Sequence, residues 1–374
     1  MVTDIFLKDN QQLFSTPVVQ QSTFWSVVKN RLGDRTMAVD FSINQSDLYI
    51  EGSFQKNIES DILVVLQYVD GTNCLAYVPY GPEIEPDDDL QALFLEELSE
   101  NLRSVLPHEC FAIRFDLHWE SLWAKEEDLY DDSGMWKGTP EISSQELRFN
   151  FTTQNWNLKK SSQNVLPSNT IYIDLKPDLE TVLQHMKPKT RYNIRLSMRK
   201  GVDVLCVGIE YLPVWYALYS ETCKRNGIFL HDIEYFRTLF SAQFDKKYTS
   251  TELFLLIAEY NETPVAAMFL TCSSHRASYL YGASSAQHRH AMATYAIQWK
   301  AMQLAKEKGC TEYDMFGVSP NPDPDHPMYG LYKFKSGFGG HMYHAMGCWD
   351  YPLNDAVYTC YKAAEMQSQG FHVS

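Results

Sequence analysis

The sequence lacks long apolar runs and paired cysteines. No hydrophobic stretch approaches the roughly 18 residues that a membrane-spanning helix requires, and the N-terminal residues lack the basic and apolar regions of a signal peptide. The eight cysteines are scattered, without a CxxC pair or the spacing of metal ligands. These absences predict a cytoplasmic protein whose cysteines are reduced and mostly buried as small hydrophobic residues.

Positive charge is scarce in the first 150 residues. They contain 10 Lys and Arg against 27 Asp and Glu, a balance of −17, whereas residues 151–374 contain 22 against 20, a balance of +2. If the net charge of −15 were spread evenly over the chain, it would disfavour a polyanionic partner. The uneven distribution instead predicts that the two parts face different partners, and that any nucleic acid binds the second part.

Length and hydrophobic pattern predict two domains. A chain of 374 residues exceeds the usual size of one hydrophobic core. A strand–turn–strand–helix–strand order is predicted twice, and polar residues 155–170 between the two copies are typical of a linker. The repeat indicates duplicated α+β domains, although this order also occurs in many other folds. The segments are 61–69, 74–79, 89–105 and 110–119, and then 253–259, 265–272, 277–281, 291–308 and 311–316.

A strongly basic segment follows the linker. Residues 187–200 contain six Lys and Arg and no acidic residue, with Pro188 placed for a helix start and Gly201 for its end. A helix would align Arg191, Arg195 and Arg199 on one face, because they are four residues apart. Such a row suits phosphate, whose oxygens match the guanidinium fork. By charge alone, a solvated face or salt bridges to the acidic first part explain it equally well.

A second segment, residues 330–340, alternates glycines with two lysines and several aromatic residues. Its glycines would allow a ligand to approach the backbone closely. Lys335 could then present its ammonium to negative charge developing on a reacting carbonyl. The simpler alternative is an ordinary glycine-rich turn with exposed lysines.

Five segments, in order along the chain, resemble the FemABX family, which forms the interpeptide bridges of peptidoglycan. They cover nearly the whole chain from about residue 20 to 340. The segments are Gln21-Ser-Thr-Phe-Trp25 with Lys29, Tyr77-Val-Pro-Tyr-Gly-Pro82, Asn164-Val-Leu-Pro-Ser-Asn-Thr170, the stretch from Lys189 to Val202, and the stretch from Leu331 to Gly340.

The resemblance implies an α+β fold of two acetyltransferase-like (GNAT-like) domains that share a cleft, with the C-terminal helix returning to the first domain. The expected domains are residues 1–164 with 347–374, which would bind the precursor, and residues 165–346, on the acyl-transfer and tRNA side. Some members carry a long helical arm in the second domain. No extended heptad pattern occurs between Asn226 and Tyr235, so this chain is similar to the armless, FemX-like members.

The resemblance also implies roles for individual residues. Lys335, preceded by Phe334, matches the lysine thought to stabilise the acyl-transfer intermediate. The remaining matched positions would bind the precursor. Many relatives have a basic residue where Tyr80 stands and an acidic residue soon after Gly81-Pro82. The contacts of the first domain with the precursor therefore differ in detail from those of the relatives. The expected substrate-binding residues are Lys29, Tyr80, Glu85, Arg191, Arg195 and Tyr235.

The implied activity is transfer of an amino acid from aminoacyl-tRNA to an amine of the precursor's stem peptide. The precursor would be UDP-MurNAc-pentapeptide or lipid II, the latter with transient contact at the membrane surface. We expect a monomer without metal or organic cofactor. The main alternative is a GNAT-type N-acetyltransferase that uses acetyl-CoA, although residues 287–293, where the pyrophosphate loop would lie, contain no glycine. A non-catalytic scaffold is a further alternative.

Overall fold

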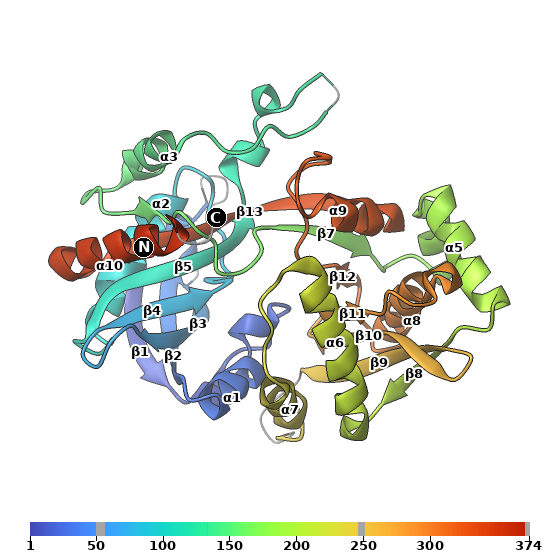
Figure 1. Cartoon of the computed structure of the whole chain (residues 1–374). Helices are drawn as coiled ribbons and strands as arrows, with labels where there is room; N and C mark the ends of the chain where they lie inside the picture. Colours follow the sequence, from blue (N-terminus) through green and yellow to red (C-terminus); the bar gives the residue numbers. More distant parts are fainter. Residues whose placement is uncertain (50–56, 133, 246–250, 371–374) are drawn as a thin grey trace. The chain divides into compact units, whose positions relative to one another are not determined.

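The computed structural model describes residues 1–49, 57–132, 134–245 and 251–370, and the chain divides into two compact units (Figure 1). Unit 1 comprises Met1–Phe14, Gln20–Ser168 and His344–Ser374, and unit 2 comprises Ser15–Val19 and Asn169–Tyr343. The units therefore change at residues 168/169 and 343/344, where the sequence suggested 164/165 and 346/347, and the short segment 15–19 belongs to unit 2.

Unit 1 is built on a sheet in the order β1-β2-β3-β4-β5-β13. Neighbouring strands are antiparallel except β4 and β5, which are parallel because helix α2 connects them. The short strand β6 pairs with β13. The strands are β1 (Val2–Lys8), β2 (Arg35–Asn44), β3 (Asn57–Tyr68), β4 (Cys74–Pro79), β5 (Cys110–Glu120), β6 (Lys159–Lys160) and β13 (His341–Pro352).

The helices of unit 1 are α1 (Thr23–Arg31), α2 (Gln91–Leu102), α3 (Ile142–Phe149) and α10 (Asp355–Gly370). Helix α1 begins after Ser22, whose side chain accepts a hydrogen bond from the Trp25 amide. Helix α2 buries Phe94 and Leu98 in the core of unit 1, where the centre of the Phe94 ring lies 6.1 Å from that of Trp119 in β5. The predicted hairpin, helix and strand of this part are confirmed.

Unit 2 repeats this plan with the strand order β7-β12-β11-β10-β9-β8. Here β11 and β12 are the parallel pair, and helix α8 connects them as α2 connects β4 and β5. The predicted duplication is therefore present. The strands are β7 (Asn169–Asp174), β8 (Asp203–Val207), β9 (Glu252–Tyr260), β10 (Thr263–Ser273), β11 (Arg276–Ser284) and β12 (Glu312–Asp314).

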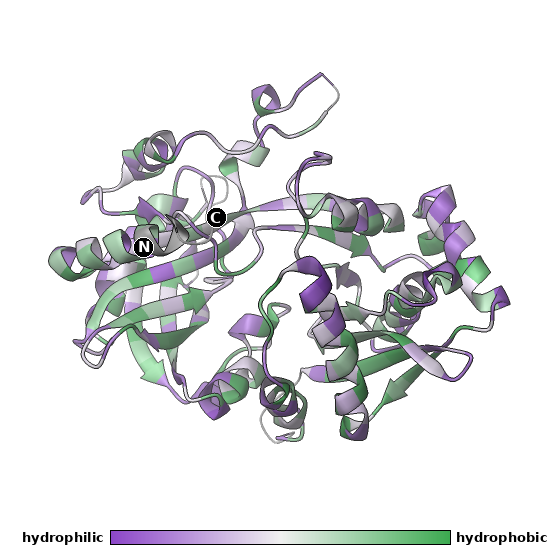
Figure 2. Cartoon of the chain, in the orientation of Figure 1, coloured by the Kyte–Doolittle hydropathy of each residue, from purple (hydrophilic) through white to green (hydrophobic). Residues whose placement is uncertain are grey.

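The helices of unit 2 are α4 (Leu179–His185), α5 (Pro188–Arg199), α6 (Leu212–Asn226), α7 (Ile233–Ala242), α8 (Ala293–Glu307) and α9 (Tyr329–Lys335). Only residues 227–232 connect α6 with α7, so no helical arm interrupts this position. Helix α5 starts at Pro188 as predicted, and Gly201 beyond its end adopts the left-handed conformation with φ 77°. Figure 2 shows the strands of both units as largely hydrophobic and most of α5 as hydrophilic.

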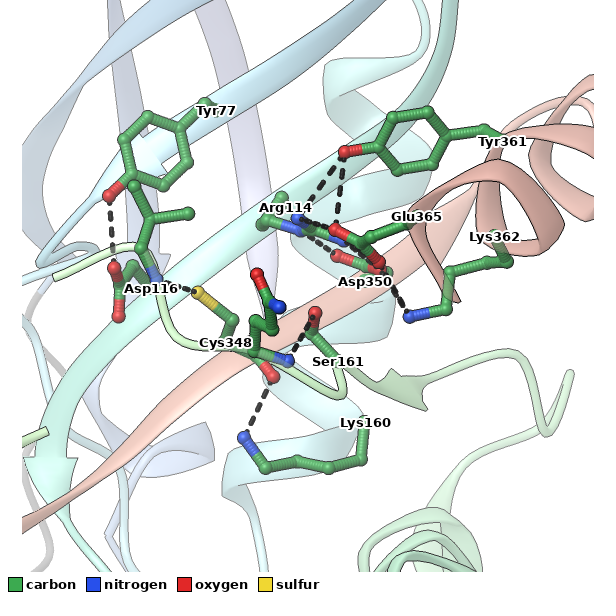
Figure 3. Close-up of polar contacts among 12 residues, drawn as sticks. Tyr77, Arg114, Asp116, Lys160, Ser161, Cys348, Asp350, Tyr361, Lys362 and Glu365 are labelled. Carbon is green, nitrogen blue, oxygen red and sulfur yellow. Dashed lines mark hydrogen bonds and ion pairs between the residues drawn. The ribbon is translucent and has the colours of Figure 1, made fainter. Parts of the chain in front are cut away.

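The C-terminal helix α10 belongs to unit 1, as expected, and packs against β5. A buried arginine holds it there (Figure 3). Arg114 of β5 donates to both carboxylate oxygens of Asp350 at 2.6 and 2.8 Å and to Glu365 of α10 at 2.8 Å. Because Arg114 and Asp350 are almost completely buried, this ion pair is shielded from solvent.

The predicted linker is part of the folded unit 1, which corrects the sequence interpretation. Lys160 of β6 is half-buried and donates to the carbonyls of Met346 and Cys348 at 3.1 and 2.9 Å, and Asn164 accepts from the Cys348 amide (Figure 3). Burial lowers the pKa of Lys160 to about 8. These polar residues bind the backbone of β13. From the sequence alone, polar residues that bind backbone groups cannot be distinguished from polar residues that face solvent. Within the described residues, no helix is both long and apolar enough to cross a membrane.

Candidate acyl-transfer site

Lys335 lies at the end of α9 with its side chain buried, only 3% exposed. Its ammonium donates to the carbonyls of Phe316 at 2.9 Å and Gly317 at 2.7 Å, and lies 5.2 Å from the centre of the Tyr279 ring. Burial lowers the pKa of Lys335 to about 7, and the nearby Asp314 carboxylate opposes this shift. An ammonium has three N–H donors, so one remains beyond these two bonds.

The two acceptor carbonyls follow β12 and are positioned by Asp314. Phe316 has the left-handed conformation with φ 57°, which is unfavourable for a residue with a side chain. Its amide donates to Asp314 Oδ1 at 2.8 Å, and the hydroxyl of Thr170 on β7 donates to the same oxygen at 2.5 Å. Burial raises the pKa of Asp314. The carboxylate thus fixes the turn whose carbonyls bind Lys335.

The segment 330–340 is not a loop, which corrects the sequence interpretation. Residues Tyr329–Lys335 form α9, and Ser336–Phe338 continue as a 3-10 helix. A side chain at Gly337 would collide with Thr190 of α5, and one at Gly340 with the carbonyl of Tyr172 in β7. Gly339 has φ 83° and lies against the carbonyl of His185. These glycines allow the segment to pack against unit 2 itself, whereas the sequence had suggested close approach of a ligand.

Phe334 and Tyr235 both lie in aromatic clusters of unit 2. The Phe334 ring packs edge to face on the Tyr295 ring of α8, with 5.1 Å between the ring centres. This contact anchors α9 on the core. Tyr235 of α7 shares a 2.7 Å hydrogen bond with Tyr281, and burial raises its pKa. Tyr281 and Tyr279 belong to the same strand, β11. This strand therefore carries the partners of both Tyr235 and Lys335.

Arg191 and Arg195 line a pocket of about 590 Å³ with residues of α4 and with Trp299 of α8. Arg191 donates to the carbonyls of Gln184 and Met186 at 2.9 and 2.5 Å, which closes the C-terminal end of α4. Among the described residues, neither arginine forms an ion pair with a carboxylate. The salt bridges considered as an alternative explanation for these two arginines are therefore not observed.

Three predicted residues lie in unit 1, and each has its own partners. The ammonium of Lys29 is 3.0 Å from Asp34. Tyr80 has φ 49° and donates its hydroxyl to the carbonyl of Pro167 at 2.5 Å. Glu85 lies 3.8 Å from Lys125, and burial raises its pKa to about 7. A carboxyl group of this kind changes charge near neutral pH, which is a property found in many binding sites.

The histidine and cysteine residues add no further site. The rings of His288 and His290 are 5.8 Å apart beside Tyr260. In the described part of the chain, no group of three His, Cys, Asp or Glu residues could hold a metal ion. Six of the eight cysteines are buried, as predicted, and Cys206 and Cys360 are exposed.

Sequence reasoning missed the residues that surround Lys335. Asp314 lies inside the predicted strand 311–316, whereas the observed strand β12 ends at this residue, before Phe316 and Gly317. Tyr279 gave no signal, because a strand tyrosine usually belongs to the core. Trp299 also gave no signal of a binding site, because it lies on the buried side of a helix.

A family model described as the FemAB family matches residues 15–261 and 242–366. The lipid II:glycine glycyltransferase of Staphylococcus saprophyticus is 24% identical over 298 residues, 63% of this chain and 71% of that protein. The same enzyme of Staphylococcus epidermidis is 23% identical over 257 residues, 53% of this chain and 61% of that protein. The chain thus spans about two thirds of these relatives.

Among solved structures, the crystal structure of FemX matches 96% of this chain and 100% of its own, with a TM-score of 0.72 and 16% identity. At this identity the likeness concerns the fold. It confirms the predicted α+β class with two GNAT-like domains.

Proposed function

Since the chain belongs to the FemAB family, we propose that it is an aminoacyltransferase that forms interpeptide bridges of peptidoglycan. It takes the amino acid from aminoacyl-tRNA and transfers it to an amine of the stem peptide of a precursor. The relatives named as lipid II:glycine glycyltransferases support a precursor of this class. The observation that carries the proposal is the buried ammonium of Lys335 with one donor left beyond its two carbonyl partners.

The proposed reaction needs little covalent help from the protein. Aminoacyl-tRNA is an activated ester, so the precursor amine attacks its carbonyl carbon directly. A C–N bond forms, the carbonyl oxygen becomes negative in the tetrahedral intermediate, and the C–O bond to the terminal ribose then breaks. The amine loses a proton, and the ribose oxygen gains one. The protein must align the two substrates and stabilise the oxyanion.

Lys335 suits the oxyanion role because its surroundings fix it before the reaction. Two carbonyls and the Tyr279 ring hold the ammonium, so little reorganisation is needed when charge develops. A pKa near 7 means that the site can also exchange a proton near neutral pH. Phe334 contributes by anchoring α9, and it acts through Lys335.

The remaining predicted residues are proposed to bind the precursor. Arg191 and Arg195 offer a pocket with two guanidiniums free of carboxylate partners, which suits a diphosphate. Lys29, Tyr80 and Glu85 of unit 1 would contact the sugar and peptide, and Tyr235 of unit 2 would do so through its ring.

We further propose that the protein acts as a monomer in the cytoplasm, where charged tRNA occurs, without metal or organic cofactor. The precursor is either UDP-MurNAc-pentapeptide or lipid II. The N-acetyltransferase alternative is tested by offering acetyl-CoA as a donor in the same assay.

The experiment incubates the protein with a mixed pool of charged tRNAs and either precursor, followed by mass spectrometry. The expected result is a precursor heavier by one or more amino acid residues, dependent on charged tRNA and abolished by ribonuclease. Acetylation of the precursor with acetyl-CoA, and no aminoacylation from any tRNA, would refute the proposal.

A further inference from the structure

Helix α5 and the residues at its ends carry more positive charge than the fold uses. Within the described residues, none of the six cations at 187–200 forms an ion pair with a carboxylate. Lys187 donates to the hydroxyl of Ser336 at 3.2 Å, and Lys200 donates to the carbonyl of His290 at 2.8 Å. Arg191 and Arg195 line the pocket beside Trp299. These four residues have partners or a position in a cavity.

Lys189 and Arg199 are the two that remain. Both are exposed, and they lie outside the residues that line the pocket. Between them Tyr192 is 55% exposed, and the Arg199 guanidinium lies 5.8 Å from the centre of its ring. At 100° per residue, positions 189, 192 and 199 fall within a quarter turn of one another, so their side chains share one side of the helix. We call these three residues the α5 face.

The α5 face is too long for a single small anion. Lys189 and Arg199 are ten residues apart, or about 15 Å along the axis at roughly 1.5 Å per residue. One diphosphate cannot neutralise both ends, whereas a polymer with regularly spaced phosphates can. An arginine within cation–π distance of an exposed tyrosine also suits an unpaired base beside those phosphates.

We propose that the α5 face binds the phosphate backbone of RNA, in the acceptor arm of the tRNA that delivers the amino acid. This inference rests on the proposed function and adds a surface for the donor, distinct from the pocket of Arg191 and Arg195. The charge distribution supports it, because unit 1 contains the whole excess of acidic residues and would repel a polyanion.

An anionic membrane is the other large polyanionic surface, and the structure of α5 argues against it. Helices that lie on membranes insert an apolar face between lipids. The inward side of α5 buries Thr190, Asn193, Ile194 and Ser197 within unit 2, so Ile194 is already covered, and Leu196 is half-buried. The exposed residues of α5 include the cations, Tyr192 and Met198, which is 54% exposed, and a single methionine does not make a continuous apolar face.

The test measures binding of uncharged tRNA to the whole protein at a series of salt concentrations by fluorescence anisotropy. Each phosphate contact contributes about 0.7–0.9 to the slope of log K against log salt. The double variant Lys189→Ala/Arg199→Ala is therefore expected to reduce the slope by about 1.4–1.8 and to weaken binding roughly tenfold or more. The control, Lys176→Ala/Lys224→Ala, removes the same charge from exposed positions of unit 2 and should keep the wild-type slope.

Other results are equally decisive. An unchanged slope in the Lys189/Arg199 variant overturns the proposal. The proposal is also overturned if the Lys189/Arg199 variant binds tRNA like the wild type but no longer binds vesicles of phosphatidylglycerol and phosphatidylcholine. The α5 face would then bind a membrane. If the wild type transfers an amino acid and the variant binds tRNA like the wild type, the role of the α5 face is refuted and the proposed function stands. A reduced slope in the variant, in a protein that transfers no amino acid, supports binding of RNA by the α5 face and refutes the proposed function.

Discussion

Replacement of Lys335 by methionine separates two effects of the buried ammonium. One is its effect on the free energy of unfolding, and the other is its effect on the rate of transfer. Methionine fills a similar volume without charge, so the change removes the ammonium and its two bonds to the carbonyls of Phe316 and Gly317. We expect the variant to lose about 10²–10³-fold in kcat, which is typical for removal of one oxyanion donor. Binding of the precursor should change little.

The effect on stability follows from the pKa of Lys335, which burial lowers from 10.5 to about 7. One pKa unit corresponds to about 1.4 kcal/mol, so the fold disfavours the charged form by about 5 kcal/mol in total. Below pH 7 the residue is charged in the folded and the unfolded state, and the folded protein bears this cost in full. Between pH 7 and 10.5 only the unfolded chain binds the proton, so wild-type stability rises with pH.

The methionine variant has no such pH dependence at this position. Its free energy of unfolding relative to wild type is therefore expected to fall by about 2.5 kcal/mol between pH 6 and pH 9. The two carbonyls left without a donor destabilise the variant by about 1–3 kcal/mol each. This loss does not depend on pH, so the change with pH isolates the contribution of the ammonium.

The assay is urea denaturation followed by tryptophan fluorescence at both pH values, together with steady-state transfer kinetics. Lys333→Met is the matched control, because Lys333 lies exposed on the same helix. It should show neither the pH-dependent stability difference nor the loss of kcat. If the difference between Lys335→Met and wild type were the same at pH 6 and pH 9, the inferred burial of a charged ammonium would be wrong. Full activity of Lys335→Met would refute its role in transfer.

Three further predictions concern other parts of the chain. Arg191→Ala should raise KM for the precursor roughly 10–100-fold with little change in kcat, because it removes a charge-assisted hydrogen bond of about 1.5–3 kcal/mol; an unchanged KM in steady-state kinetics would contradict this. Asp350→Ala leaves Arg114 buried without its main partner and should lower the free energy of unfolding of unit 1 by about 3–5 kcal/mol in urea denaturation; a loss below about 1 kcal/mol would show that solvent reaches the pair. Gly337→Ala should lower both the melting temperature and the transfer rate through collision with Thr190, and Thr190→Ala in the same chain should restore much of both; absence of any rescue would show that the collision is not the cause.

Much of the fold could be predicted from local patterns. Helix α5 starts at Pro188 because that residue fits the first turn of a helix, and β3 and β4 form a hairpin because their β-branched runs flank Asp70-Gly71. The segment 330–340 was interpreted wrongly as a loop. Its glycines are required by contacts with Thr190, His185 and Tyr172, which lie about 150 residues earlier in the chain.

By itself, the sequence determined the order of the strands and helices in the two repeated segments, the division of charge and the motifs that placed the chain in its family. These properties depend on residues close together in the chain. Only the tertiary structure decided the environment of Lys335, because Thr170 and Asp314 are 144 residues apart and meet only when β7 pairs with β12. Strand pairing and helix packing thereby bury the ammonium against two carbonyls and lower its pKa.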